Sequence, residues 1–118
     1  MGENRIKLVA ADMDGTLLNR ERKITKYTQN VIKKAMAQGV YFVPATGRAV
    51  NALPPELKEM EGIRYGIFSN GATIYDLKEE KVIYKNHFEM DRVLELMDFL
   101  KQFDLMESIS LNGQSYAN

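Results

Sequence analysis

The sequence contains no cysteine and no tryptophan, and it has only three prolines and one histidine among 118 residues. The absence of cysteine excludes disulfide bonds, thiolate metal sites and cysteine nucleophiles, and it fits a reducing compartment. No apolar run approaches the length that spans a membrane, and the charged segment Met1–Arg5 is not followed by the apolar core of a signal peptide. We therefore expect a cytoplasmic protein without a membrane partner.

An excess of charge of one sign is also missing. Sixteen lysine and arginine residues balance sixteen aspartate and glutamate residues, so the formal net charge is zero. A balanced chain offers no electrostatic reason to bind nucleic acid, and we expect no such partner. At 118 residues the chain is long enough for one hydrophobic core and too short for two full domains.

The most informative segment lies near the start of the chain. An apolar run, Leu8 to Ala11, has the composition of a buried strand and ends in Asp12, Asp14 and Gly15. Ligands of open α/β sheets bind beyond the carboxyl ends of the strands. A turn at Gly15 allows both carboxylates to face one ligand, which a straight strand would not allow. The segment therefore predicts a reaction centre at a strand end.

Paired carboxylates in this position suit phosphoryl transfer. One carboxylate can attack phosphorus, while the other protonates the leaving oxygen and later deprotonates water. Mg²⁺ prefers oxygen ligands and often binds through one or two carboxylates together with substrate phosphate. Asp12 and Asp14 are therefore the candidate catalytic residues and the candidate Mg²⁺ ligands.

A calcium loop of the EF-hand type is an alternative for the same residues. Asp12, Asp14, Gly15 and Glu21 fit the end of its pattern. The first ligand position would then be Ala10, which has no side-chain oxygen, and the preceding residues predict a strand rather than a helix. These two mismatches disfavour the calcium loop.

A βαβ unit connects this strand to the next. Thr25 is a candidate N-cap of an amphipathic helix, Gly39 ends that helix, and residues 40–45 predict a second strand. Such a connection makes the two strands parallel, so their carboxyl ends meet at one edge. Thr46 should therefore lie beside Asp12 although the two residues are far apart in sequence.

The rest of the chain predicts a third strand and a change of pattern after it. Residues 49–60 predict a helix interrupted by Pro54 and Pro55, and residues 65–69 a strand that ends at Asn70-Gly71. Residues 73–76 and 81–85 predict a hairpin that leaves the main sheet. The segments expected beyond it are a helix with an apolar stripe from Val93 to Phe103, a strand over 105–111, a turn at Asn112-Gly113 and the start of a strand at Tyr116.

Three segments together resemble the haloacid dehalogenase-like (HAD) hydrolases, in particular the Cof-like sugar-phosphatase branch. They are Asp12-Met13-Asp14-Gly15-Thr16-Leu17-Leu18, Val43-Pro44-Ala45-Thr46-Gly47-Arg48 and Phe68-Ser69-Asn70-Gly71-Ala72-Thr73-Ile74-Tyr75-Asp76. The resemblance implies that Asp12 is the nucleophile and Asp14 the general acid and base. It also implies that the carbonyl of Asp14 joins Asp12 on Mg²⁺, and that the Thr46 hydroxyl holds the transferring phosphoryl group.

Other residues of these segments are candidates for binding phosphate or substrate: Met13, Gly15, Thr16, Gly47, Arg48 and Asn70. Arg48 can serve as a bidentate donor to a phosphate or as a solvated arginine at a helix start. Asn70 can orient Asp14 or substrate, or it can simply form a turn with Gly71. Thr16 can bind phosphate or form a local hydrogen bond in its loop.

The resemblance implies an α/β fold with a doubly wound, Rossmann-like parallel sheet, which is incomplete here, and the beginning of an inserted α+β cap. Residues 1–84 then form the first half of the core, and residues 85–118 the start of the cap. In the family the first strand lies between the second and the fourth. We therefore expect an open edge at residues 6–11, which favours self-association.

The family also has a lysine that offsets charge at the nucleophile and an acidic cluster that completes the Mg²⁺ site, both after the cap. The sequence ends at Asn118, before either signature. We therefore expect a fragment of a longer protein, or a chain that a partner completes. The leading hypothesis is a Mg²⁺-dependent phosphatase for a small phosphorylated metabolite such as a sugar phosphate, acting through an aspartyl-phosphate. A non-catalytic binding or assembly module and a phosphomutase with the same intermediate remain alternatives.

Overall fold

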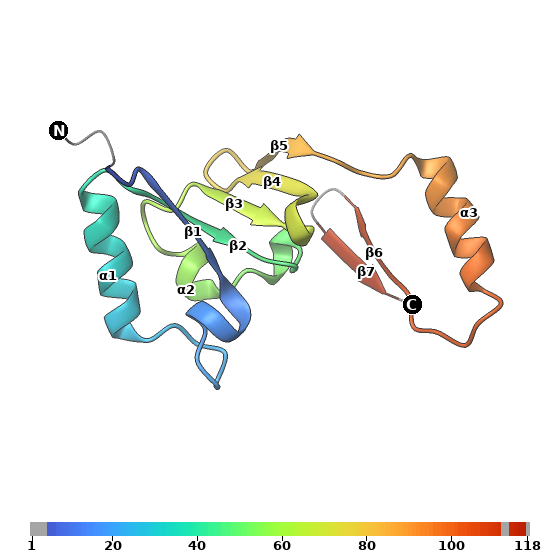
Figure 1. Ribbon diagram of the computed structural model, residues 1–118, viewed down its shortest axis with the longest axis horizontal. Helices are drawn as coiled ribbons and strands as arrows, with labels where there is room; N and C mark the ends of the chain where they lie inside the picture. Colours follow the sequence, from blue (N-terminus) through green and yellow to red (C-terminus); the bar gives the residue numbers. More distant parts are fainter. Residues whose placement is uncertain (1–4, 112–113, 118) are drawn as a thin grey trace.

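The computed structural model describes residues 5–111 and 114–117. Its main feature is a five-stranded sheet with the strand order β1-β2-β3-β4-β5 (Figure 1). These strands are β1 (Leu8–Asp12), β2 (Tyr41–Ala45), β3 (Tyr65–Phe68), β4 (Thr73–Asp76) and β5 (Lys81–Lys85). The first three run parallel and the last two are antiparallel additions, so the sheet is mixed. The expected α/β fold is confirmed.

The predicted βαβ unit forms as the sequence indicates. The helix α1 (Lys26–Ala37) follows Thr25, whose hydroxyl oxygen accepts a hydrogen bond from the N–H of Thr28 at 3.2 Å. This N-cap satisfies one of the free donors of the first turn. Gly39, with φ of 86°, then turns the chain into β2. β1 and β2 pair in parallel from Leu8 opposite Tyr41 to Asp12 opposite Ala45.

The segment between β2 and β3 breaks at the prolines, as predicted. A short 3₁₀ turn, Val50–Ala52, precedes the one-turn helix α2 (Pro55–Lys58), which has a proline at its first position. Leu57 of α2 is fully buried in the core. The other buried members of this core cluster come from the loops and strands around it: Met13, Leu18, Ile24, Ile32, Phe42, Leu53, Met60, Ile63 and Phe68.

The hairpin β4–β5 differs from the prediction that it leaves the main sheet. β4 pairs antiparallel with β3 from Phe68 opposite Thr73 to Tyr65 opposite Asp76, so the hairpin extends the sheet. Asp76 fixes its turn, because the carboxylate is buried and accepts hydrogen bonds from the N–H groups of Lys78 and Glu79, both at 3.0 Å. The short turn between β3 and β4 brings adjacent strands together, whereas sequence alone indicated only the pairing within the hairpin.

A second group of elements lies beyond the main sheet. It comprises α3 (Met90–Leu100) and the two-stranded sheet of β6 (Ser108–Leu111) and β7 (Gln114–Ala117). Figure 1 shows the β6–β7 hairpin between the main sheet and α3, and the strand arrows of β2 and β3 point toward it. The radius of gyration is 17.0 Å, against about 13 Å for a compact domain of some 100 residues. The predicted turn at Asn112-Gly113 lies outside the described residues.

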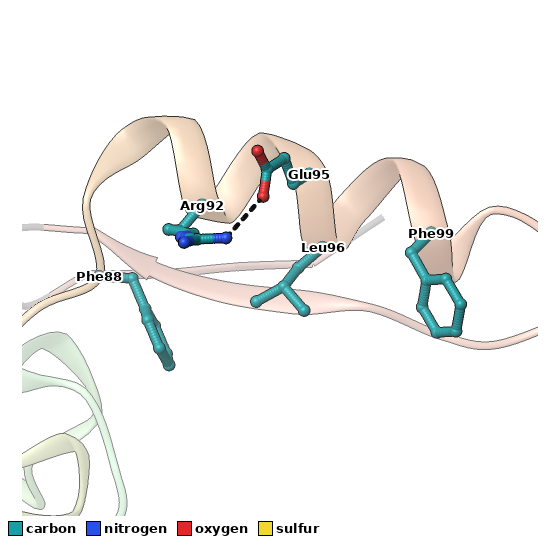
Figure 2. A pocket seen from close by; sticks show the side chains of 5 residues that line it. All are labelled: Phe88, Arg92, Glu95, Leu96 and Phe99. Carbon is teal, nitrogen blue, oxygen red and sulfur yellow. Dashed lines mark hydrogen bonds and ion pairs between the residues drawn. The ribbon is translucent and has the colours of Figure 1, made fainter.

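The helix α3 leaves much of its apolar surface exposed. A shallow hollow on one side of it is lined by Phe88, Arg92, Glu95, Leu96 and Phe99, and Arg92 forms an ion pair with Glu95 within it (Figure 2). Phe88 is 75% exposed and Phe99 56%. A helix this apolar normally packs against a further layer.

β1 is an edge strand of the main sheet in the described part of the chain, as the sequence predicted. Leu8 and Val9 are exposed there, as is Ile6 just before the strand. An exposed apolar edge strand presents unpaired N–H and C=O groups that can pair with another strand. None of the helices between residues 5 and 117 that the structure describes combines the length and apolarity needed to cross a bilayer.

Candidate active site

The carboxyl ends of the three parallel strands converge on one edge. Asp12 ends β1 opposite Ala45 at the end of β2, and Thr46 follows directly. Main-chain hydrogen bonds then join the loop after β2 to the loop after β3. The N–H of Asn70 donates to the carbonyl of Thr46 at 3.1 Å, and the N–H of Ser69 donates to the carbonyl of Arg48 at 2.9 Å. The structure therefore brings the three predicted segments together.

The loop after β1 presents its two carboxylates to solvent around a buried anchor. Met13, which lies between them, is fully buried. A wide helical turn, Met13–Leu17, closes when the N–H of Leu18 donates to the carbonyl of Met13 at 2.9 Å. The left-handed conformation of Gly15, with φ of 77°, reverses the chain within this turn. Asp12 Oδ1 accepts the N–H of Met13 at 2.9 Å, which fixes one oxygen of the candidate nucleophile.

The burial of Met13 limits its predicted contact with substrate. Its side chain points into the core, and its N–H is already bonded to Asp12. The side chain therefore anchors the loop rather than contacting a phosphate. Gly15 and Thr16 of the same loop are exposed, so both remain accessible to a ligand at this edge.

Arg48 and Asp14 form a bidentate ion pair. The guanidinium Nη2 lies 2.7 Å from Oδ1 of Asp14, and Nε lies 3.0 Å from Oδ2. The remaining terminal nitrogen, Nη1, donates to the main-chain carbonyl of Ala52 at 3.0 Å. The hydrogen bonds from Arg48 lower the pKa of Asp14, and its positive charge acts in the same direction. Reciprocally, the hydrogen bonds to Asp14 raise the pKa of Arg48.

Thr46 is buried beside this pair. Its hydroxyl oxygen accepts the N–H of Arg48 at 3.0 Å, and its own N–H donates to the carbonyl of Ile67 at 2.9 Å. Both bonds hold the threonine at the junction of β2 and β3. Because a hydroxyl group can donate and accept at once, the Thr46 hydroxyl can still donate a hydrogen bond to a phosphoryl oxygen.

Asn70 adopts the left-handed conformation with φ of 56°, as does Ser69 with φ of 51°. This is the conformation of a turn asparagine, which was one of the two predicted roles. Its side chain lies against Gly47 in the neighbouring loop. Asn70 is exposed at the same edge as Thr46.

Two contacts near the edge were not predicted from the sequence. The hydroxyl oxygen of Ser69 lies 3.1 Å from that of Ser110 on β6, and β7 lies against the turn Val50–Ala52. The β6–β7 hairpin is thereby placed beside the candidate site. Ser69 lies within a family segment, but no sequence signal indicated its partner 41 residues away.

The donor atoms at this edge fit Mg²⁺ in part. Asp12 and Asp14 supply oxygen ligands of the kind that Mg²⁺ prefers, and Mg²⁺ commonly takes its remaining ligands from water and substrate phosphate. Among the described residues, no group of three or more histidine, aspartate or glutamate side chains gathers around a common point. In the part of the chain that the structure describes, the protein side chains alone therefore do not form a closed metal site. The residues before Asp12 form a strand rather than an entering helix, which also disfavours the calcium loop.

Comparison with known sequences gives one consistent family. A family model described as haloacid dehalogenase-like hydrolase matches residues 9–118. A protein of Buchnera aphidicola subsp. Schizaphis graminum, provisionally named a phosphatase, is 39% identical over 115 residues, which are 95% of this chain and 41% of that protein. The 5-amino-6-(5-phospho-D-ribitylamino)uracil phosphatase YcsE of Bacillus subtilis is 37% identical over 89 residues, which are 72% of this chain and 36% of that protein.

Solved structures agree with this result. The HAD subclass IIB sugar phosphatase BT4131 matches with a TM-score of 0.77 at 29% identity, and the match covers 94% of this chain and 43% of that one. The chain spans about two fifths of the length of the curated relatives it matches.

Proposed function

Because the chain belongs to the haloacid dehalogenase-like hydrolases, we propose that it carries the nucleophilic half of a phosphatase acting on a small phosphorylated metabolite. The observation that carries this proposal is the convergence of Asp12, Asp14 and Thr46 on one sheet edge. Two carboxylates and a hydroxyl at such an edge match the needs of phosphoryl transfer better than those of a structural turn.

The proposed reaction has two displacements at phosphorus. An oxygen of Asp12 attacks phosphorus, the bond to the leaving oxygen breaks, and Asp14 gives that oxygen a proton. Asp14, now a carboxylate, takes a proton from water as the water oxygen attacks phosphorus. The bond between phosphorus and Asp12 then breaks, which releases phosphate and restores the carboxylate. The pairing with Arg48 lowers the pKa of Asp14, which favours the carboxylate form needed for the second displacement and disfavours the protonated form needed for the first.

The remaining residues of the edge are proposed to bind the phosphoryl group. The Thr46 hydroxyl and the exposed main chain around Gly15, Thr16 and Gly47 provide donors for its oxygens, and Asn70 borders the same space. Asp12 and the carbonyl of Asp14 would hold Mg²⁺, which supplies positive charge against the phosphate oxygens when it is bound.

The substrate class is proposed from two considerations. YcsE and BT4131 are named for phosphorylated small molecules, a ribitylamino-uracil phosphate and sugar phosphates. The edge is also built from short polar side chains suited to a phosphate group. We accordingly propose a sugar phosphate or a similar metabolite as substrate, and a cytoplasmic location in keeping with the absence of cysteine.

We further propose that additional residues complete the enzyme, either in a longer chain or in a partner. The relatives are more than twice as long as the matched segment, and β1 presents an open edge. Residues 1–84 would then form the first half of the core and residues 85–118 the start of a cap. In isolation, the same edge favours self-association of the chain.

A non-catalytic role is the second candidate, and the open β1 edge and the exposed apolar surface of α3 favour it. Under this alternative the chain binds phosphate or assembles with a partner without turnover. Replacement of Asp12 separates the two candidates. Phosphate release from p-nitrophenyl phosphate should be measured with Mg²⁺ for the wild-type chain and for Asp12→Asn.

Asp12→Asn removes the nucleophile and should reduce release to the uncatalysed background. Turnover that persists in Asp12→Asn contradicts the proposed mechanism. A folded wild-type chain without turnover supports the non-catalytic alternative for these 118 residues. Circular dichroism of both proteins provides the control for folding.

A further inference from the structure

Arg48 is held more firmly than its partner Asp14. Its side chain is 27% exposed, whereas the Asp14 side chain is 56% exposed. The main chain of Arg48 is fixed on both sides, because its N–H donates to Thr46 and its carbonyl accepts from Ser69. Its guanidinium is anchored as well, through the bond from Nη1 to the carbonyl of Ala52.

The Asp14 carboxylate, in contrast, accepts hydrogen bonds only from Arg48 among the described residues. Its backbone is extended within the turn, with φ of −70° and ψ of 122°, and the left-handed Gly15 follows. Both carboxylate oxygens accept hydrogen bonds from the two donors of one guanidinium edge. Two parallel bonds of this kind fix the plane of the carboxylate as well as its position.

Another arginine–aspartate pair in the described part of the chain has the opposite arrangement. Asp76 is the buried partner and Arg64 the exposed one, at 3% and 42%. Nε and Nη2 of Arg64 both donate to one oxygen of Asp76, Oδ2, at 3.2 and 3.1 Å. There the aspartate is held by the main chain of the β4–β5 turn, and it orients the arginine. At the candidate active site the arginine is the fixed member.

We propose that Arg48 is a positioning residue that fixes the carboxylate of Asp14, and that it does not bind the substrate phosphate. Each of its three guanidinium nitrogens already donates a hydrogen bond to another group of the protein. An effect of Arg48 on the reaction rate rests on the proposed function, in which Asp14 transfers the proton. A proton donor must lie within hydrogen-bond reach of the leaving oxygen, and a misplacement of about 1 Å can cost about 10²-fold in rate.

A positioning role and a phosphate-binding role of Arg48 affect different kinetic constants. Loss of a positioning residue lowers kcat, because Asp14 is then free to rotate away, and it leaves KM nearly unchanged. Loss of a phosphate-binding arginine raises KM instead. Arg48→Met should therefore lower kcat for p-nitrophenyl phosphate on the order of 10²-fold. Arg48→Lys should recover only a small part of that loss, since an ammonium group cannot form two parallel bonds.

A spectroscopic measurement tests the pair without turnover. The side-chain Nε–H of Arg48 should show an NMR order parameter close to that of rigid backbone, about 0.85. In Asp14→Asn the value should stay near this level, because Nη1 remains bonded to the carbonyl of Ala52. Asp12→Asn should leave it unchanged, because Asp12 makes no bond to Arg48 among the contacts of the described residues. Arg64→Met, which removes the arginine–aspartate pair with Asp76, serves as the matched control for both measurements.

Each outcome decides the inference. An Arg48 side chain that stays rigid in Asp14→Asn, together with a selective loss of kcat in Arg48→Met, supports it, whereas an Arg48 that becomes mobile in Asp14→Asn overturns it. An Arg48 side chain that is mobile in the wild type, or a rise in KM at constant kcat, overturns it. If the wild-type chain shows no turnover that depends on Asp12, the proposed function fails for this chain. The order parameter alone then decides whether Arg48 is the fixed member of the pair.

Discussion

Gly47 lies directly against the side chain of Asn70: a Cβ atom at position 47 would be 2.8 Å from Oδ1 of Asn70. The two residues belong to the loops that follow β2 and β3, and the N–H of Asn70 is bonded to the carbonyl of Thr46. The glycine therefore allows these two loops of the candidate site to approach closely. Its backbone does not require a left-handed conformation, so the constraint is one of space.

The first prediction concerns this contact. Gly47→Ala should displace the Asn70 side chain and destabilise the protein near the low end of the 1–3 kcal/mol that overpacking costs, about 1 kcal/mol. The cost is limited because the clashing oxygen lies at the end of a rotatable side chain. Asn70→Gly removes that side chain and tolerates the positive φ. Urea unfolding of the two single variants and the double variant should show that Asn70→Gly reduces the effect of Gly47→Ala; additive effects contradict this contact.

A second prediction concerns Met13, the buried residue between the two carboxylates. Met13→Ala leaves a cavity below the loop and should lower the free energy of unfolding by about 2–5 kcal/mol. Met13→Leu conserves volume and should cost less than about 1.5 kcal/mol. Urea denaturation measures both effects. Equal, small losses in the two variants are incompatible with Met13 as the anchor of this loop.

The position of the candidate site was predictable because its residues follow parallel strands. The apolar run before Asp12, the N-cap at Thr25 and the stop at Gly39 specify β1, α1 and β2 from local chemistry. Parallel pairing then places Thr46 beside Asp12 without knowledge of any side-chain contact.

The ion pair of Arg48 with Asp14 was not predictable in the same way. It depends on the conformation of two loops separated by 34 residues and on the choice of side-chain rotamers. The attachment of β4 to β3 was also missed. A period-2 pattern identifies a hairpin, but it does not specify which further strand the hairpin joins.

The third prediction is a dependence of stability on pH through Asp76. Hydrogen bonds from the main chain at Glu79, together with Arg64 and Lys78, lower the pKa of Asp76. An unfolded aspartate titrates near pH 3.9, so the folded state gains stability that is fully present above about pH 4. This stability is lost as the pH falls through the lower folded pKa.

Asp76→Asn should therefore lower the thermal unfolding midpoint at pH 7, and the difference from wild type should shrink below about pH 4. Asp98→Asn is the matched control, because Asp98 is 75% exposed and forms a surface ion pair with Lys101 at the end of α3. Thermal unfolding followed by circular dichroism from pH 2 to pH 7 measures both. A constant difference over this range would contradict the role given to the Asp76 carboxylate.

The last prediction concerns the open edge at β1. Unpaired N–H and C=O groups on an apolar edge strand favour pairing with another strand, and a charged side chain on the edge opposes such pairing. Val9, the second residue of β1, is 38% exposed. If the isolated 118-residue chain self-associates through this edge, Val9→Lys should shift it toward monomer in sedimentation velocity. Tyr27→Lys, at a position that is 79% exposed on α1, should have no such effect. Equal shifts in the two variants would mean that the loss of apolar surface, rather than strand pairing, controls association. A change with Val9→Lys alone identifies β1 as the edge through which the chain self-associates.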